Sequence, residues 1–174
     1  KDIDINEVIA TVFDATADLM MEQNPDPKKI AEKMLEIAMD TIEAESGTFY
    51  LADVNGHELT FAAVAGPKAD QLKKGTMTVP VGQGIVGFAA QEGVCLVIQD
   101  MQNDSRYFSA IADKIGYAPQ NTLCASAEKE GRLFGALQLI NAKAGGFSAG
   151  EMEVVRYIGL SAADMLERAF EQNT

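Results

Sequence analysis

The chain has 174 residues and a formal net charge of −12, from 26 acidic and 14 basic side chains. This length suffices for one well-buried domain, and no Pro-, Ser- or Gly-rich linker divides it. The negative charge disfavours nucleic acids and anionic membrane surfaces as partners. Every apolar run is far shorter than a membrane span, so we expect no membrane insertion.

Two helices are predicted at the start of the chain. Apolar residues at 3-4-3-4 spacing indicate the first, within residues 1–24: Ile5, Val8, Val12, Ala15 and Leu19. A second apolar stripe runs along it: Ile9, Phe13 and Met20. Asn24-Pro25 ends this helix. Asp26-Pro27 begins the next, since Asp is a preferred N-cap and Pro suits the first helical position.

Two β-hairpins are predicted in the middle of the chain. Asn55-Gly56 is a strong signal for a tight turn, and it separates strand-like runs at 48–54 and 58–65. A second hairpin is predicted from runs at 121–128 and 133–142. Antiparallel strands joined in this way form a sheet whose faces carry alternate residues.

The glycine segment between the hairpins fits a dinucleotide-binding pattern, with glycines at 82, 84 and 87. The context is wrong for that function. The preceding run, 76–80, is short and ends in proline, and the following helix spans only about two turns. We therefore interpret these glycines as a tight turn into a short helix.

A long helix is predicted at the end of the chain, beginning at a capping box of Ser148 and Glu151 and reaching about Phe170. It carries two apolar stripes: Val155, Ile158, Ala162, Met165 and Ala169, and Met152, Gly159, Leu166 and Phe170. Two stripes on both terminal helices predict a homodimer through these helices. The alternative is that the terminal helices pack only on each other within one chain.

Together these elements predict an α+β domain. It has a central antiparallel sheet of about five to six strands, helices on both faces, and N- and C-terminal helices packed together. We expect one domain over 1–174, with a helix in 1–24, the sheet and a pocket in 25–148 and a helix in 149–171. The chain begins with lysine, so we expect it to be part of a longer protein.

Over nearly its whole length the sequence resembles the GAF domain family of sensory modules. Four motifs carry the resemblance by their order and spacing: Gly82-x-Gly84-Ile-Val-Gly87 with Ala89-Ala90, Val97-Ile98-x-Asp100, Asn103-Asp104-x-Arg106-Tyr-Phe108, and Gly135-x-Leu137-Gln-Leu-Ile-Asn141. The resemblance implies a cytoplasmic bacterial signalling domain. It also implies a small ligand held between the sheet and the segment 82–120.

Polar residues on one predicted sheet face agree with such a pocket, because a face meant only for helix packing would be apolar. The candidate ligand-binding residues are Asp100, Arg106, Phe108, Ile111, Thr122, Cys124, Ser126 and Gln138. The alternative for Thr122, Ser126 and Gln138 is that they face solvent or bond nearby backbone.

Arg106 has two possible roles. Beside aromatic residues it could clamp a phosphate or carboxylate. It could instead pair with Asp100 or Asp104 and hold the loop, and we favour this second role slightly because buried arginines are usually paired. Phe108 and Ile111 share a helical face that would cover the pocket or the core.

The ligand is not identified by the sequence. Relatives that bind cyclic nucleotides often carry an Asn-Lys pair, then a Phe and an Asp-Glu pair. Here Ala142 separates Asn141 from Lys143, and Met152 stands at the last acidic position. Cyclic nucleotide is therefore not favoured. The lone His57 lies in a predicted turn without partner ligands, so no metal or haem site is indicated.

Cys95 and Cys124 suit a reducing compartment better than a disulfide framework, which favours the cytoplasm. Neither has a basic neighbour in sequence to lower its pKa, and the segment 85–87 lacks the cysteine of sulfoxide reductases with this fold. We therefore predict a non-catalytic sensory domain that binds an unidentified small molecule and signals through its terminal helices. The alternatives are a ligand-free dimerisation or spacer domain and, third, a cysteine-dependent redox enzyme.

Overall fold

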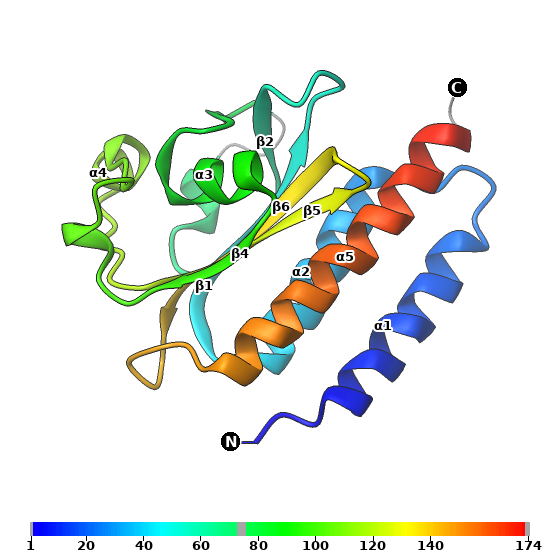
Figure 1. Ribbon diagram of the computed structural model, residues 1–174, viewed down its shortest axis with the longest axis horizontal. Coiled ribbons are helices and arrows are strands. Elements are labelled where there is room, and N and C mark those ends of the chain that lie inside the picture. The colour runs from blue at the N-terminus through cyan, green and yellow to red at the C-terminus, as the bar shows by residue number, and fades with distance from the viewer. Residues whose placement is uncertain (1, 73–75, 173–174) are drawn as a thin grey trace.

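The computed structural model describes residues 2–72 and 76–172 of the chain. Within them, an antiparallel sheet of six strands runs in the order β3-β2-β1-β6-β5-β4 (Figure 1). The strands are β1 (Ala44–Ala52), β2 (Glu58–Ala65), β3 (Thr78–Pro80), β4 (Cys95–Ile98), β5 (Thr122–Lys129) and β6 (Arg132–Ala142). The α+β class and the antiparallel sheet expected from the sequence are confirmed.

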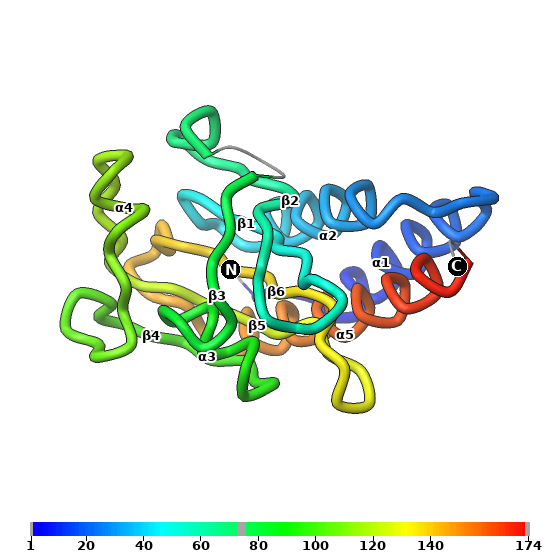
Figure 2. The backbone as a smooth tube through the Cα atoms, turned by 90° about the horizontal axis from the view of Figure 1, so that it is seen from above, coloured from blue at the N-terminus to red at the C-terminus, as the bar shows by residue number. Residues whose placement is uncertain are grey.

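Helices cover both faces of the sheet. On one face lie α2 (Pro27–Thr41) and α5 (Ala149–Gln172), with α1 (Ile5–Met20) packed outside them. The other face carries α3 (Gly84–Glu92) and α4 (Ala110–Ile115). The short helix α4 projects at one end of the molecule, whereas the α1–α2 connection lies at the other (Figure 1 and Figure 2).

The helix starts follow local capping chemistry. Asp26 accepts a hydrogen bond from the Lys28 amide at 2.9 Å, with Pro27 as the first residue of α2. At the start of α5 the Ser148 amide donates to Glu151 Oε1 at 2.8 Å, and the Glu151 amide donates to Ser148 Oγ at 3.1 Å. This reciprocal capping box is the one predicted from the sequence.

Both hairpins form, with boundaries that differ from the predicted ones. Strand β1 begins at Ala44, earlier than expected, because its first residues pair with the end of β6. The β5–β6 turn is tighter than expected. Lys129 pairs with Arg132, and the two residues between them, Glu130 and Gly131, have positive φ angles of 51° and 80°. Positive φ at both positions is typical of a two-residue type I′ turn.

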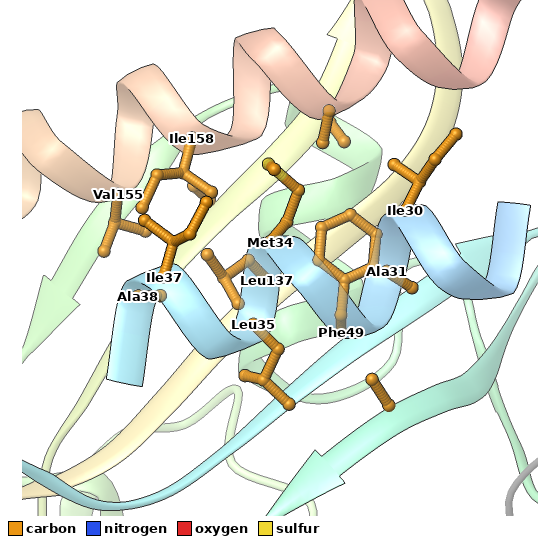
Figure 3. Packing of buried hydrophobic residues seen from close by; sticks show 14 of the residues in the cluster. Ile30, Ala31, Met34, Leu35, Ile37, Ala38, Phe49, Leu137, Val155 and Ile158 are labelled. Atoms are coloured by element: carbon orange, nitrogen blue, oxygen red, sulfur yellow. The ribbon is translucent and has the colours of Figure 1, made fainter. Parts of the chain in front are cut away.

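The main core lies between the sheet and the pair α2 and α5. Ile30, Met34 and Ile37 of α2 point toward α5 and the sheet (Figure 3). Val155 and Ile158 of α5 are fully buried there. Both apolar stripes predicted on α5 are largely buried within the chain, against the sheet and α2. The homodimer expected through the terminal helices stays a prediction.

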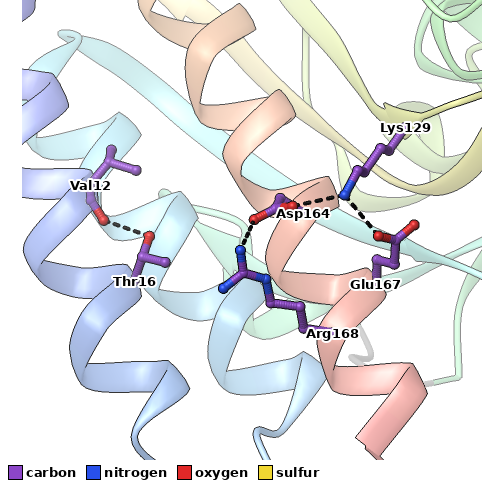
Figure 4. Close-up of polar contacts among 6 residues, drawn as sticks. All are labelled: Val12, Thr16, Lys129, Asp164, Glu167 and Arg168. Atoms are coloured by element: carbon purple, nitrogen blue, oxygen red, sulfur yellow. Dashed lines mark hydrogen bonds and ion pairs between the residues drawn. The ribbon is translucent and has the colours of Figure 1, made fainter.

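The β5–β6 hairpin is tied to α5 by charged side chains. Lys129 Nζ donates to Asp164 Oδ1 at 2.9 Å and to Glu167 Oε1 at 2.8 Å (Figure 4). Arg168 also pairs with Asp164, at 3.0 Å. All four side chains are partly exposed, so these ion pairs add little to the free energy of unfolding. Their main effect is to orient the hairpin on α5.

Asn141 anchors the segment that covers the other sheet face. Its backbone has a positive φ of 61°, a conformation that Asn tolerates better than most residues. Asn141 Oδ1 accepts the Gln120 amide at 2.7 Å, and Asn141 Nδ2 donates to the Tyr117 hydroxyl at 3.2 Å. The end of the cover is thus fixed by one side chain on β6.

We predict that Gly159→Ala destabilises the domain. A Cβ at this position would lie 2.8 Å from the Ser126 carbonyl oxygen of β5, so α5 or the sheet must shift. We expect a loss of about 1–3 kcal/mol in the free energy of unfolding, measured by urea denaturation. Gly150→Ala, on the same helix, is the control. Its nearest neighbour would be 3.9 Å away, so stability should stay equal or rise. Equal stability of the two variants would contradict the close contact.

We predict that Asn141→Ala costs about 2 kcal/mol, since it removes the side-chain hydrogen bonds, including those with Gln120 and Tyr117, and places Ala at a positive φ. Asn141→Gly loses the same hydrogen bonds without the backbone strain, so its loss should be about 1 kcal/mol smaller. Urea denaturation of both variants measures the difference. If Ala and Gly are equally destabilising, the positive φ is not maintained in solution.

Candidate ligand-binding site

A partly open cavity of about 130 Å³ lies on the sheet face opposite α2 and α5. Its floor comes from β1, β2 and β6. Its cover comes from the α3 N-terminus, from α4 with its flanking loops, and from a short helical turn at Ala69–Gln71. The cavity therefore lies between the sheet and the segment 82–120, where the sequence predicted a pocket. The contribution from the β2–β3 connection was not predicted.

The cavity wall is mainly apolar, with a few polar groups. The apolar lining includes Tyr50, Phe61, Leu72, Val79, Ile85, Val86, Met101, Tyr107, Phe108, Ile111, Ile115 and Ile140. The polar lining consists of Ser46, Thr48, Lys68, Gln83, Tyr117 and Gln138, together with the tyrosine hydroxyls. Among the described residues of this wall there is no Asp, Glu, His or Cys.

A hydrogen-bonded chain forms the polar part of the floor. The Tyr50 hydroxyl donates to Gln138 Oε1 at 3.0 Å, and Gln138 Nε2 donates to Thr122 Oγ1 at 3.3 Å. Thr122 Oγ1 in turn donates to the Leu139 carbonyl oxygen at 2.8 Å. Burial raises the pKa of Tyr50 well above its usual value, so the phenol stays neutral. The floor is neutral and internally satisfied before any ligand enters.

A second polar contact closes the side of the cavity. Ser46 Oγ and the Tyr117 hydroxyl lie 2.9 Å apart, joining β1 to the loop that follows α4. Burial is the main cause that raises the pKa of Tyr117. Because Asn141 also binds Tyr117, the floor and the cover are connected through one tyrosine.

Three predicted site residues line the cavity: Phe108, Ile111 and Gln138. Phe108 is half exposed, which places it at the mouth. Thr122 and Cys124 are on the same sheet face but fully buried below the cavity wall. Thr122 donates to a backbone carbonyl, which was the alternative considered for it.

Ser126, Asp100 and Arg106 lie outside the cavity wall, so a direct role for them in binding stays a prediction. Ser126 pairs with Ala136 farther along the sheet. Asp100 caps a short helical turn by accepting hydrogen bonds from the amide and side chain of Asn103.

Arg106 makes the local ion pair that we favoured. Its Nε and Nη2 atoms donate to the two carboxylate oxygens of Asp104 at 2.9 and 2.7 Å. Hydrogen bonding by Arg106 is the main cause that lowers the pKa of Asp104 to about 2. The guanidinium also lies 4.7 Å from the centre of the Phe88 ring. The guanidinium thus uses its N–H groups on Asp104 and its face on the Phe88 ring, and these contacts hold the loop before α4.

The sequence reasoning missed the β1 side chains Ser46, Thr48 and Tyr50, and it missed Lys68. Thr48 and Tyr50 alternate along the predicted strand 48–54, so the pattern that identified Thr122 and Gln138 could have identified them, whereas Ser46 precedes that predicted strand. Lys68 lies in a connection without periodic pattern, and its position depends on how that connection folds back over the sheet.

The two cysteines are not suited to nucleophilic chemistry at neutral pH. Burial raises the pKa of the Cys95 thiol to about 11 and that of the Cys124 thiol to about 12. Both therefore stay protonated, and neither lines the cavity. Within residues 2–72 and 76–172 no group of three His, Cys, Asp or Glu side chains could hold a metal ion.

A second, wider hollow of about 760 Å³ lies among turn residues, including Asn55, His57, Glu92 and Arg132. His57 is exposed in the β1–β2 turn, as predicted. The smaller cavity remains the candidate site, because small-molecule sites are mostly apolar and concave with a few polar groups. No helix in the described part of the chain is long and apolar enough to cross a membrane.

Comparison with known proteins agrees with this architecture. A curated relative, the dual 3',5'-cyclic-AMP and -GMP phosphodiesterase 11A of Takifugu rubripes, is 27% identical over 128 residues. The match covers 70% of this chain but only 14% of that protein. This chain thus spans about one seventh of the length of its relative.

Several solved structures share the fold. The GAF domain of a phosphoenolpyruvate-protein phosphotransferase from Coxiella burnetii has a TM-score of 0.75 at 15% identity, covering 94% of this chain and 97% of that one. A free methionine-R-sulfoxide reductase from Neisseria meningitidis, solved with its substrate, has a TM-score of 0.73 at 15% identity, covering 98% and 95%. The family model for the GAF domain matches residues 26–166. The chain belongs to the GAF domain family, as the sequence motifs indicated.

Proposed function

We propose that this GAF domain is a non-catalytic sensor that binds a small molecule in the 130 Å³ cavity and reports occupancy through its terminal helices. The observation that carries the proposal is the cavity itself. It is concave and mainly apolar, its floor is already hydrogen-bonded, and its described wall has no Asp, Glu, His or Cys. These properties support binding without turnover.

The cysteines argue against the redox alternative. The Neisseria meningitidis neighbour is a methionine sulfoxide reductase, and thiol enzymes need a reactive thiolate near the substrate. Here both thiols lie outside the cavity wall, and burial raises the pKa of each. Two unpaired thiols support a reducing compartment, so we place the domain in the cytoplasm.

Cyclic nucleotide is not our favoured ligand, although the Takifugu rubripes relative is a cyclic-nucleotide phosphodiesterase. A cavity of about 150 Å³ holds one benzene ring. At 130 Å³ the present cavity has no space for a base, a sugar and a phosphate together. Binding of a cyclic nucleotide would require the cover to move outward or part of the nucleotide to remain at the mouth of the cavity.

The output route that we propose is a homodimer formed through the terminal helices. Ile5, Ile9 and Phe13 leave an apolar stripe on the outer face of α1, with Phe13 70% exposed. Leu160 adds an exposed apolar side chain on α5. The same stripe would serve a ligand-free spacer domain, so the cavity must be tested separately from the dimer. A ligand would signal only if it favours one helix arrangement over another.

If a ligand occupies the cavity, two variants of α4 should differ in how well they retain it. Ala112 lines the cavity, whereas Ala110 is an exposed residue of the same helix outside the wall. We expect Ala112→Phe to fill the space and abolish ligand retention, while Ala110→Phe retains it. Native mass spectrometry after incubation with a metabolite extract, repeated under denaturing conditions, measures the bound mass. A wild-type chain that takes up no small molecule would refute the sensor proposal.

The dimer proposal predicts that Phe13→Glu shifts the chain toward monomer, because the charge would enter an apolar seam. Sedimentation velocity over a range of concentrations measures the effect, and we expect the dimer to weaken by at least about tenfold. Val54→Glu is the matched control, since Val54 is 86% exposed in the β1–β2 turn, far from α1. Equal association of the two variants would show that the α1 stripe is not the seam.

A further inference from the structure

The size of the cavity limits the part of a ligand that it can enclose. Its volume of about 130 Å³ is slightly below that of a cavity known to hold one benzene ring. The wall includes Phe61, Ile85 and Ile140, which are apolar side chains from three different elements. A single ring or a short branched chain fits this space, and a larger part of the ligand would have to remain at the mouth.

The charge of the wall is opposite to that of the protein. The chain carries 26 acidic side chains and a net charge of −12, yet no carboxylate belongs to the described wall. Among the described residues of the wall, the one ionic side chain is Lys68, on the connection between β2 and β3. Lys68 is half-buried and forms no ion pair with any other described residue. A partly desolvated ammonium beside an apolar space is stabilised by an anion.

Backbone amides at the N-terminus of α3 also bring partial positive charge to the cavity. The first residues of α3, from Gly84 to Val86, line the cavity, and the residue at the N-cap position, Gln83, makes no side-chain capping bond. The leading amides of a helix are not satisfied within it, and the helix dipole is positive at that end. This contribution adds to the effect of Lys68 without replacing it.

We propose that the cavity selects a small monoanion with an apolar body, of the class of aromatic or branched monocarboxylates. The apolar body occupies the space above the Tyr50–Gln138 floor, and the carboxylate lies toward Lys68. This assignment rests on the proposed sensor function and names the ligand class for the same site. Selectivity arises because a neutral isostere would leave the ammonium without a partner, and an acidic dianion would have only one cation to meet.

The test compares benzoate with benzamide, which has the same ring and nearly the same shape but no charge. Isothermal titration calorimetry is carried out on the wild-type chain, on Lys68→Met and on Lys143→Met. Lys143 is an exposed lysine outside the wall, so its variant controls for the loss of one positive charge. Circular dichroism melting shows whether each variant remains folded.

We expect the wild-type chain and Lys143→Met to bind benzoate at least about tenfold more tightly than benzamide, as is typical of a charge-assisted hydrogen bond. Lys68→Met should lose this preference and keep its affinity for benzamide. Increasing salt should weaken benzoate binding and leave benzamide unaffected.

Equal affinity for the two compounds in the wild-type chain, or an unchanged preference in Lys68→Met, would overturn the assignment of the ligand class while leaving the sensor function in place. Failure of both compounds to bind the folded wild-type chain would also overturn the ligand class. The sensor function fails separately, if the wild-type chain takes up no molecule from a metabolite extract.

Discussion

The alternation of side chains along β1 and β6 is the constraint on which the rest of the structure depends. Phe49, Leu137 and Leu139 face α2 and α5 and are fully buried there. Because neighbouring residues of a strand point to opposite faces, Tyr50 and Gln138 must face the other side. One side of the sheet thereby carries the main core, and the other carries a smaller core cluster and the cavity. The site is a consequence of the core pattern, since a register shift of one residue would exchange the two faces.

Most of the fold could be predicted from the sequence because its signals are local. The capping box at Ser148, the Asp26-Pro27 helix start and the Asn55-Gly56 turn each depend on residues a few positions apart. The strand boundaries were less accurate, since they are set by pairing between distant segments. Ala44, for example, belongs to β1 only because Ala142 of β6 lies opposite it.

The position of the candidate site was predicted from the sequence, but most of the residues that line it were not. Strand periodicity identified Gln138, and the family resemblance located the cover near Phe108 and Ile111. Periodicity cannot show depth, so Thr122 and Cys124 shared the correct face but lie beneath the cavity wall. Sequence patterns also cannot show which of several nearby acidic side chains will pair with an arginine. Lys68 was missed because its role depends on the path of a connection.

The contact at Gly159 has a mechanical consequence. The α5 backbone touches β5 there more closely than any side chain would allow, and the helix continues for more than a turn on either side of this point. Buried residues lie on both sides of this point, from Val154 to Ala169, so α5 is held against the sheet and α2 along most of its length. A displacement of β5 at this contact would therefore move α5 as a whole.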